Sequence, residues 1–143
     1  MLAQLLNKIW DRMKVFVYGT LKPGKCNYQR YCQGKVVDAC PAIASGKLFA
    51  LPAGYPAMTA GVGDVYGFVL TFSSKAVLGD LDRLEDYNSL RPPEENEYQR
   101  QEIEVFDRDR LSLGTAWAYL MLRDRVLSLG GVPLPDGSWE NNQ

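Results

Sequence analysis

The sequence contains no histidine at any of its 143 positions. Serine and cysteine nucleophile systems that depend on a histidine base are therefore excluded, and so are zinc sites with imidazole ligands. Any proton transfer near neutral pH must use glutamate, aspartate, lysine, tyrosine or cysteine. The pKa of such a group would have to be shifted by its surroundings.

Cysteine is scarce as well. The three cysteines are Cys26, Cys32 and Cys40, and their spacing matches no tight pair of metal ligands, so we expect no metal site. An odd number of cysteines with no secretory leader ahead of them is typical of a reducing compartment. The sequence therefore predicts a cytoplasmic protein.

The chain also lacks an excess of charge of either sign and any long apolar run. Sixteen basic residues oppose 17 acidic ones, for a net charge of −1. A sequence-independent nucleic-acid binder needs a clear basic excess, and a membrane span needs about 20 apolar residues. The expected partner is a small molecule, with no nucleic acid and no membrane. Length and a 46% hydrophobic content predict a single globular domain.

The first residues form a separate feature. Apolar side chains recur at helical spacing from Leu2 to Met13, which predicts an amphipathic helix. We interpret residues 1–13 as an extension that docks on the core or on the partner subunit of a possible homodimer, and residues 14–143 as one domain.

Strand-like segments outnumber helical ones in that domain. Strands are expected at Lys14–Tyr18, Lys35–Leu51, Asp64–Phe72, Tyr98–Asp107 and Thr115–Leu122. A short helix is expected at Asn27–Gln33, and Ser73 and Ser74 favour the start of a longer helix that runs to Tyr87. Asn88–Asn96 is expected as a loop and Gly130–Gln143 as an irregular tail. These elements predict the α+β class with a mixed, barrel-like sheet.

The segment Gly19–Cys26, GTLKPGKC, has the spacing of a phosphate-binding loop after a strand. Cys26 cannot supply the hydroxyl that binds Mg²⁺, and Pro23 removes one backbone N–H from the middle of the loop. The next segment reaches Gly34 too soon for a long helix. We therefore do not interpret this motif as a nucleotide site.

One glutamate falls on the apolar side of the predicted Ser74–Tyr87 helix. On a helical wheel the apolar arc contains Val77, Leu78, Leu81 and Leu84, and Glu85 falls inside it. Asp80, Asp82, Arg83 and Asp86 fall outside it. Burial and the negative end of the helix dipole would both raise the pKa of Glu85. Two interpretations remain open: a general base, or a glutamate that pairs with an arginine at the rim of the core.

A set of short motifs, in order along the chain, resembles the γ-glutamylcyclotransferase-like family, in particular the γ-glutamylamine cyclotransferases and their bacterial relatives. The motifs are YGTLKPG at Tyr18–Gly24, GYP at Gly54–Pro56, GDVYG at Gly63–Gly67, LDRLEDY at Leu81–Tyr87, YQR at Tyr98–Arg100 and AWAY at Ala116–Tyr119. Together they span most of the domain. The resemblance implies a small mixed β-barrel with flanking helices.

The resemblance also implies roles for individual residues. The family's catalytic acid/base falls on Glu85, and its loop for the γ-glutamyl group falls on Tyr18, Gly19, Thr20 and Leu21. Tyr98 and Tyr119 are candidates for pocket walls or hydroxyl donors, with ordinary core tyrosines as the equal alternative. Asp86 departs from the family, which has glycine after the catalytic glutamate.

The implied reaction is intramolecular and needs no cofactor. The α-amine of a γ-glutamyl amine or amino acid attacks its own γ-carbonyl, and the products are 5-oxoproline and the free amine. Two alternatives stay open at this point. The same pocket could bind a small acidic metabolite without turnover, or the enzyme could be a lyase that removes a γ-glutamyl protecting group.

Overall fold

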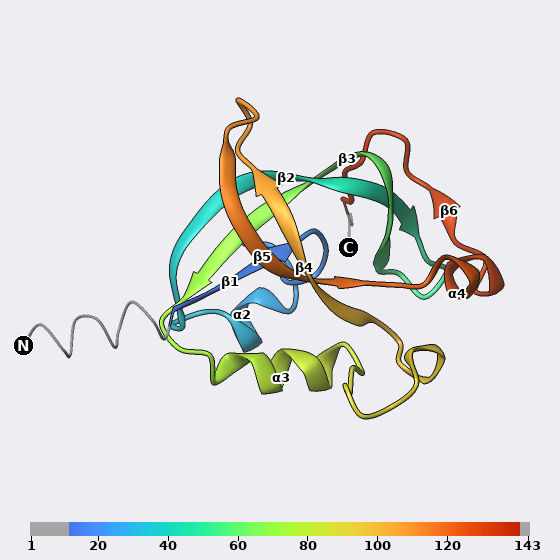
Figure 1. Ribbon diagram of the computed structural model, residues 1–143, viewed down its shortest axis with the longest axis horizontal. Helices are drawn as coiled ribbons and strands as arrows, with labels where there is room; N and C mark the ends of the chain where they lie inside the picture. Colours follow the sequence, from blue (N-terminus) through green and yellow to red (C-terminus); the bar gives the residue numbers. More distant parts are fainter. Residues whose placement is uncertain (1–11, 141–143) are drawn as a thin grey trace, which may run out of the picture.

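The computed structural model describes residues 12–140 (Figure 1). The helix expected near the N-terminus therefore lies outside the described residues, apart from its last two positions. One of these, Met13, corrects the expectation. It is the first residue of strand β1 (Met13–Val17) and is 5% exposed. Its side chain belongs to the domain core, because β1 pairs with β3 from this residue onward.

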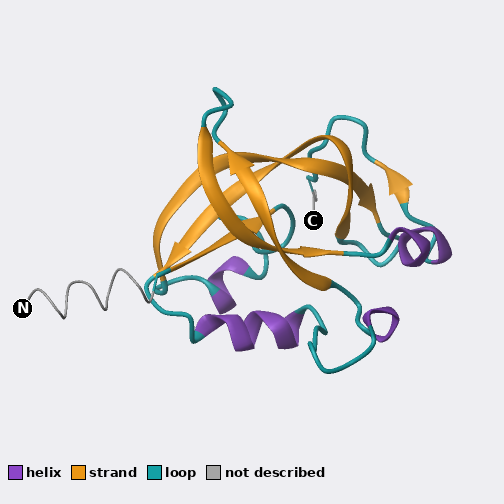
Figure 2. Cartoon of the chain, in the orientation of Figure 1, coloured by secondary structure: helices purple, strands orange, loops and turns teal. Residues whose placement is uncertain are grey.

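Within residues 12–140 six strands form one sheet, in the order β3-β1-β5-β4-β2-β6. The strands after β1 are β2 (Val36–Ala50), β3 (Pro56–Phe72), β4 (Gln99–Phe106), β5 (Ser112–Leu120) and β6 (Val132–Pro133). An additional pairing joins β3 to β2, so the first five strands form a closed loop of neighbours (Figure 2). The mixed sheet predicted from sequence is confirmed, as a ring rather than a strict barrel.

Neighbouring strands of the ring are paired over very different lengths. β2 and β3 form a long antiparallel hairpin, and β4 and β5 form a second one. Their connections are short: β1 meets β5 in parallel at Val15 and Trp117, and β4 meets β2 at Ile43 and Phe106.

β3 is longer than the sequence indicated, because it begins at Pro56 rather than at Asp64. β2 lies within the expected bounds and continues through Pro41 and Gly46. A register shift between Ser45 and Lys47 accommodates Gly46, as a β-bulge does.

The helices are short, and two of them cover one side of the ring. They are α2 (Tyr28–Tyr31), α3 (Val77–Leu84) and α4 (Arg123–Ser128), with a 3-10 turn η1 (Pro93–Glu95). Figure 1 shows α2 and α3 together below the sheet. α3 is shorter at both ends than expected. At its start Ser74 accepts a hydrogen bond from Ala76 N–H in a turn that precedes the helix, and at its end Asp86 has a φ of 52°. α4 was not anticipated.

Strand β1 is buried on both faces and divides the core. Val15 and Val17 belong to the cluster that also contains Val77 and Leu81 of α3. Phe16 and the following Tyr18 belong to a second cluster on the opposite face. This explains why the segment is a continuous apolar run without alternation. Among residues 12–140 no helix is long and apolar enough to cross a membrane.

Candidate active site

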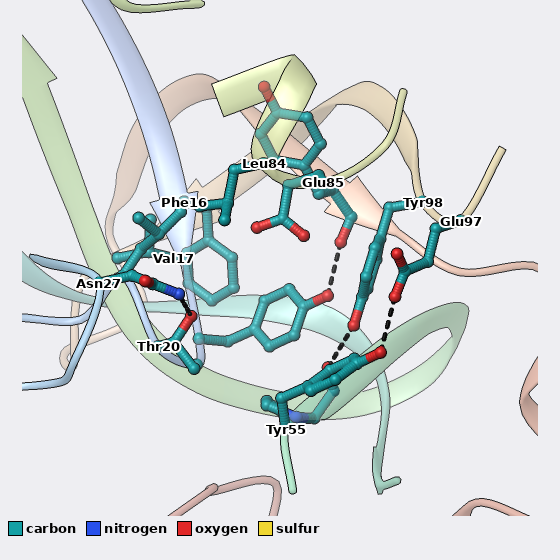
Figure 3. Close-up of a pocket in the computed structure, with 14 residues that line it drawn as sticks. Phe16, Val17, Thr20, Asn27, Tyr55, Leu84, Glu85, Glu97 and Tyr98 are labelled. Carbon is teal, nitrogen blue, oxygen red and sulfur yellow. Dashed lines mark hydrogen bonds between the residues drawn. The ribbon is translucent and has the colours of Figure 1, made fainter. Parts of the chain in front are cut away.

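A cavity of about 260 Å³ lies where β1 ends and α3 ends (Figure 3). All seven residues that the sequence suggested for a site line it: Tyr18, Gly19, Thr20, Leu21, Glu85, Tyr98 and Tyr119. Its remaining walls are Phe16, Val17, Asn27, Tyr55, Pro56, Leu84 and Glu97. The charged side chains among these residues are the two glutamates, so the lining carries acid and no base.

Glu85 directs its carboxyl group into this cavity (Figure 3). In residues 12–140 no arginine or lysine forms a salt bridge with it, so the pairing with a rim arginine is not observed. Burial raises the pKa of Glu85 to about 8, and the nearby charge of Glu97 adds to this. The direction agrees with the sequence argument. The second cause is another carboxylate, which the helical wheel did not reveal.

The end of α3 fixes the backbone of Glu85. Glu85 N–H donates to Leu81 O at 2.9 Å, and Tyr87 N–H donates to Asp82 O at 2.8 Å across the helix end. Asp86 lies between them with φ of 52°. This is the Schellman arrangement, whose left-handed position normally carries glycine. Asp86 thus occupies the left-handed position at the helix end that glycine normally takes.

A partly buried network of hydrogen bonds holds the same turn from the sheet side. The Tyr119 hydroxyl donates to Asp82 Oδ1 at 2.7 Å, and Arg100 Nη1 donates to Asp82 Oδ2 at 2.9 Å. The Arg100 guanidinium also lies over the rings of Tyr87 and Trp117, at 5.3 and 4.9 Å from their centroids. Asp82 therefore contacts the sheet through residues of β4 and β5, although the helical wheel placed it off the apolar face of the helix. These contacts tie the last turn of α3 to the sheet.

Tyr18 and Tyr98 form walls of the cavity. The Tyr18 hydroxyl donates to Tyr119 O at 2.5 Å and accepts from Met58 N–H at 3.2 Å. The Tyr98 hydroxyl donates to Pro56 O at 2.8 Å. Burial holds the pKa of both hydroxyls far above the usual value for tyrosine. Both groups therefore stay protonated and bonded to the backbone, which makes them poor proton acceptors.

The loop after β1 presents backbone donors. Lys22 N–H donates to Gly19 O at 3.0 Å and closes a turn. Within the described chain the N–H groups of Gly19, Thr20 and Leu21 have no protein acceptor. A side chain on Gly19 would put its Cβ 2.7 Å from Pro56 Cγ, so only glycine fits without displacing the loop. Three such donors in succession suit a carboxylate or an oxyanion.

Trp139 and Glu140, near the end of the chain, contact the lysines that follow this loop. Lys22 is 6% exposed, and its ammonium donates to Trp139 O at 2.7 Å. Lys22 and Lys25 also form salt bridges with Glu140, at 3.5 and 2.8 Å. In a phosphate-binding loop the lysine next to the glycines faces the ligand and a long helix follows. Here Lys25 faces Glu140, and the next helix, α2, has four residues.

Tyr55 and Glu97 were missed by the sequence reasoning. The Tyr55 hydroxyl donates to Glu97 Oε1 at 2.7 Å, and Glu97 N–H donates to Asp86 O at 3.1 Å. Tyr55 lies in the GYP turn, and Glu97 immediately precedes the YQR motif. Both positions adjoin motifs that had been recognised, but no local pattern indicates that the two side chains meet.

Metal binding receives no support from the described part of the chain. Among residues 12–140 no group of three or more histidine, cysteine, aspartate or glutamate side chains is arranged to hold an ion. What the cavity offers instead is a carboxyl group of raised pKa opposite a row of backbone donors. The carboxyl group can accept a proton from a substrate while the backbone donors bind the substrate's negative group.

Comparison with known proteins gives a consistent result. The family model described as gamma-glutamyl cyclotransferase, AIG2-like, matches residues 15–141. No curated protein matches the sequence.

Solved structures show the same fold. An AIG2-like protein from Mus musculus superposes with a TM-score of 0.67 at 20% identity, over 91% of this chain and 89% of that one. YkqA from Bacillus subtilis gives 0.62 at 22% identity over 90% of this chain, which spans 39% of YkqA. The uropathogenic E. coli-specific protein c4763 gives 0.62 at 17% identity, over 90% of this chain and 92% of that one.

Proposed function

The chain belongs to the AIG2-like γ-glutamyl cyclotransferase family, and from this premise we propose that it cyclises small γ-glutamyl compounds to 5-oxoproline. Membership of the family supports a cyclotransferase in general terms. The observation that carries the specific proposal is Glu85, a carboxyl group of raised pKa in the cavity that Gly19–Leu21 also line, where the N–H groups of these three residues have no acceptor within the described chain.

Substrate binding follows from the charges of a γ-glutamyl unit. Its α-carboxylate suits the backbone donors of Gly19–Leu21, since successive N–H groups form a site for an anion. Its α-ammonium suits Glu85, which has no cation of its own among the described residues. The side chains of Tyr18 and Tyr98 line the space between. Holding the amine near the γ-carbonyl in this way lowers the barrier to ring closure.

The reaction then needs one group that takes a proton and returns it. The Glu85 carboxylate removes a proton from the α-ammonium, and the neutral amine attacks the γ-carbonyl carbon to form the new C–N bond of the lactam. The tetrahedral intermediate collapses with cleavage of the bond to the leaving nitrogen, which takes the proton from Glu85. The regenerated carboxylate then removes the second proton from the ring nitrogen and passes it to the departing amine, which leaves as an ammonium ion. A pKa of about 8 lets the carboxyl group act in both directions near neutral pH.

The direct test is the release of 5-oxoproline from a panel of γ-glutamyl amines and γ-glutamyl amino acids. We expect turnover of at least one class, without added metal or cofactor. A folded protein that binds these compounds saturably and releases no 5-oxoproline would contradict the proposal. That result would instead favour a binding module for γ-glutamyl or other small acidic metabolites.

A further inference from the structure

Glu97 is a second carboxylate in the cavity, and the reaction described above does not use it. Figure 3 shows Glu97 and Thr20 at opposite sides of the cavity, with Glu85 and the ring of Tyr98 between them. If the α-carboxylate of the substrate lies at the loop and its amine at Glu85, the Glu97 side is left for the group attached to the γ-carbonyl. That group is the leaving amine.

Glu97 is held in place through both its backbone and its side chain. Its backbone N–H donates to Asp86 O at 3.1 Å, and its Oε1 accepts from the Tyr55 hydroxyl at 2.7 Å. The preceding residue, Asn96, is 2% exposed and is hydrogen-bonded through its side chain to the backbone of Asn88. Glu97 therefore presents a fixed negative charge at the cavity wall, with its second oxygen unbonded in the described structure.

No cation of the described chain neutralises this charge. Glu97 forms no salt bridge within residues 12–140. Arg125 lies near enough for its charge to act on Tyr55, but it does not line the cavity. A leaving group with a carboxylate would face repulsion from Glu97, whereas one with a second ammonium would be attracted to it.

We propose that Glu97 is a specificity-determining residue, which selects γ-glutamyl substrates whose leaving amine carries an additional positive charge, as a singly acylated diamine does. The inference rests on the proposed cyclotransferase function and adds the class of leaving group. The distant ammonium takes no part in the bond changes. It pairs with the free oxygen of Glu97 while the acylated nitrogen receives its proton from Glu85.

Three γ-glutamyl amides of similar length separate charge from size: those of diaminobutane, pentylamine and aminobutyrate. For the wild-type protein we expect kcat/KM for 5-oxoproline release to be highest for the cationic amide and lowest for the anionic one. The cationic amide should exceed the neutral one about tenfold, which corresponds to about 1.4 kcal/mol. In Glu97→Gln that ratio should fall close to one, while the exposed control Glu94→Gln should keep it.

Equal kcat/KM for the three amides in the wild type would overturn this selectivity and leave the cyclotransferase proposal intact. A cationic-to-neutral ratio that persists in Glu97→Gln would also overturn it. Absence of 5-oxoproline from all three amides would contradict the proposed function itself, and this inference with it. Should Glu97→Gln fail to fold, Tyr55→Phe serves as the second variant. It frees Oε1 from its bond and should lower the ratio, and an unchanged ratio would count against the proposal.

Discussion

The two sides of the cavity differ in the groups that they offer a ligand. On one side the Gly19–Leu21 loop offers backbone N–H groups and is held by the buried ammonium of Lys22. On the other side Glu85 and Glu97 offer carboxyl groups on the end of a helix and on a loop. The first side depends on shape, because backbone donors keep their chemistry whatever side chain they carry. The second depends on charge, because burial and the nearby charge of Glu97 raise the pKa of Glu85.

The strongest test of the acidic side is Glu85→Gln. The amide keeps the size of the side chain and cannot accept the α-ammonium proton, so we expect kcat to fall by at least about 10². Stability should hold or rise, since a neutral amide costs less to bury than a carboxylate. Initial rates of 5-oxoproline release and urea unfolding would measure the two effects.

Glu104→Gln is a suitable control for this variant, because Glu104 is an exposed glutamate on β4. Asp82→Asn is unsuitable, since Asp82 binds Tyr119 and Arg100. Unchanged turnover per folded molecule in Glu85→Gln, with reduced stability, would show that Glu85 has a structural role.

The same glutamate should make stability depend on pH. Its pKa is about 8 in the folded protein against an ordinary value of 4.5, so between these values the folded state holds a proton that the unfolded state has released. Stability is therefore complete below about pH 4.5 and falls as pH rises towards 8. The loss should be on the order of 1 to 4 kcal/mol. No histidine titrates in this window. Urea unfolding at pH 5 and pH 8 should show a decrease in the free energy of unfolding in the wild type and little decrease in Glu85→Gln. An equal decrease in the two proteins would contradict the assignment.

Gly19→Ala tests the backbone side through shape alone. The added Cβ would lie 2.7 Å from Pro56 Cγ, so the loop must move and its N–H groups lose their alignment. We expect kcat/KM to fall roughly tenfold to a hundredfold. Gly79→Ala, whose Cβ meets its nearest atom at 3.7 Å within α3, is the matched control and should preserve kcat/KM. Comparable losses in both variants would indicate general destabilisation rather than a displaced loop.

Lys22→Met removes the support behind the loop. The methionine keeps much of the volume, but Trp139 O loses the donor that lies 2.7 Å away. We expect a loss of about 1 to 3 kcal/mol in the free energy of unfolding, the usual cost of an unpaired buried polar group. Lys25→Met breaks a salt bridge to the exposed Glu140 and should cost less than about 1 kcal/mol. Thermal denaturation of the two variants side by side would measure the difference, and equal losses would contradict this ranking.

The smallest effect is expected at Asp86. Glycine suits the φ of 52° better than aspartate does, whereas the exposed salt bridge to Arg91 would be lost. We expect Asp86→Gly to raise the free energy of unfolding by less than about 1 kcal/mol. Asp86→Ala keeps the strain and loses the salt bridge, so it should lower stability. The two variants should therefore move the urea midpoint in opposite directions, and a shift in the same direction would be inconsistent with this account.

Short-range patterns predicted much of this protein. The apolar spacing of α3 placed Glu85 inside its arc, and β1, α2, β4 and β5 were expected close to where they occur. The short strand β6 lies in a tail that was expected to be irregular. Other features escaped prediction. β3 extends eight residues earlier than its apolar run suggested, from Pro56 rather than Asp64, because its pairing with β2 continues past the bulge at Gly46.

What the sequence determined by itself was the composition of each wall: a glycine-containing turn after a buried strand, and a glutamate on the apolar face of a helix. Both follow from periodicity and turn chemistry, which act over a few neighbouring residues. The tertiary structure alone decided which groups meet across the cavity. Tyr55 and Glu97 are 42 residues apart, and Lys22 and Trp139 are 117 apart. Such contacts depend on strand register and on the closure of the sheet into a ring, and no local pattern of residues encodes either of them.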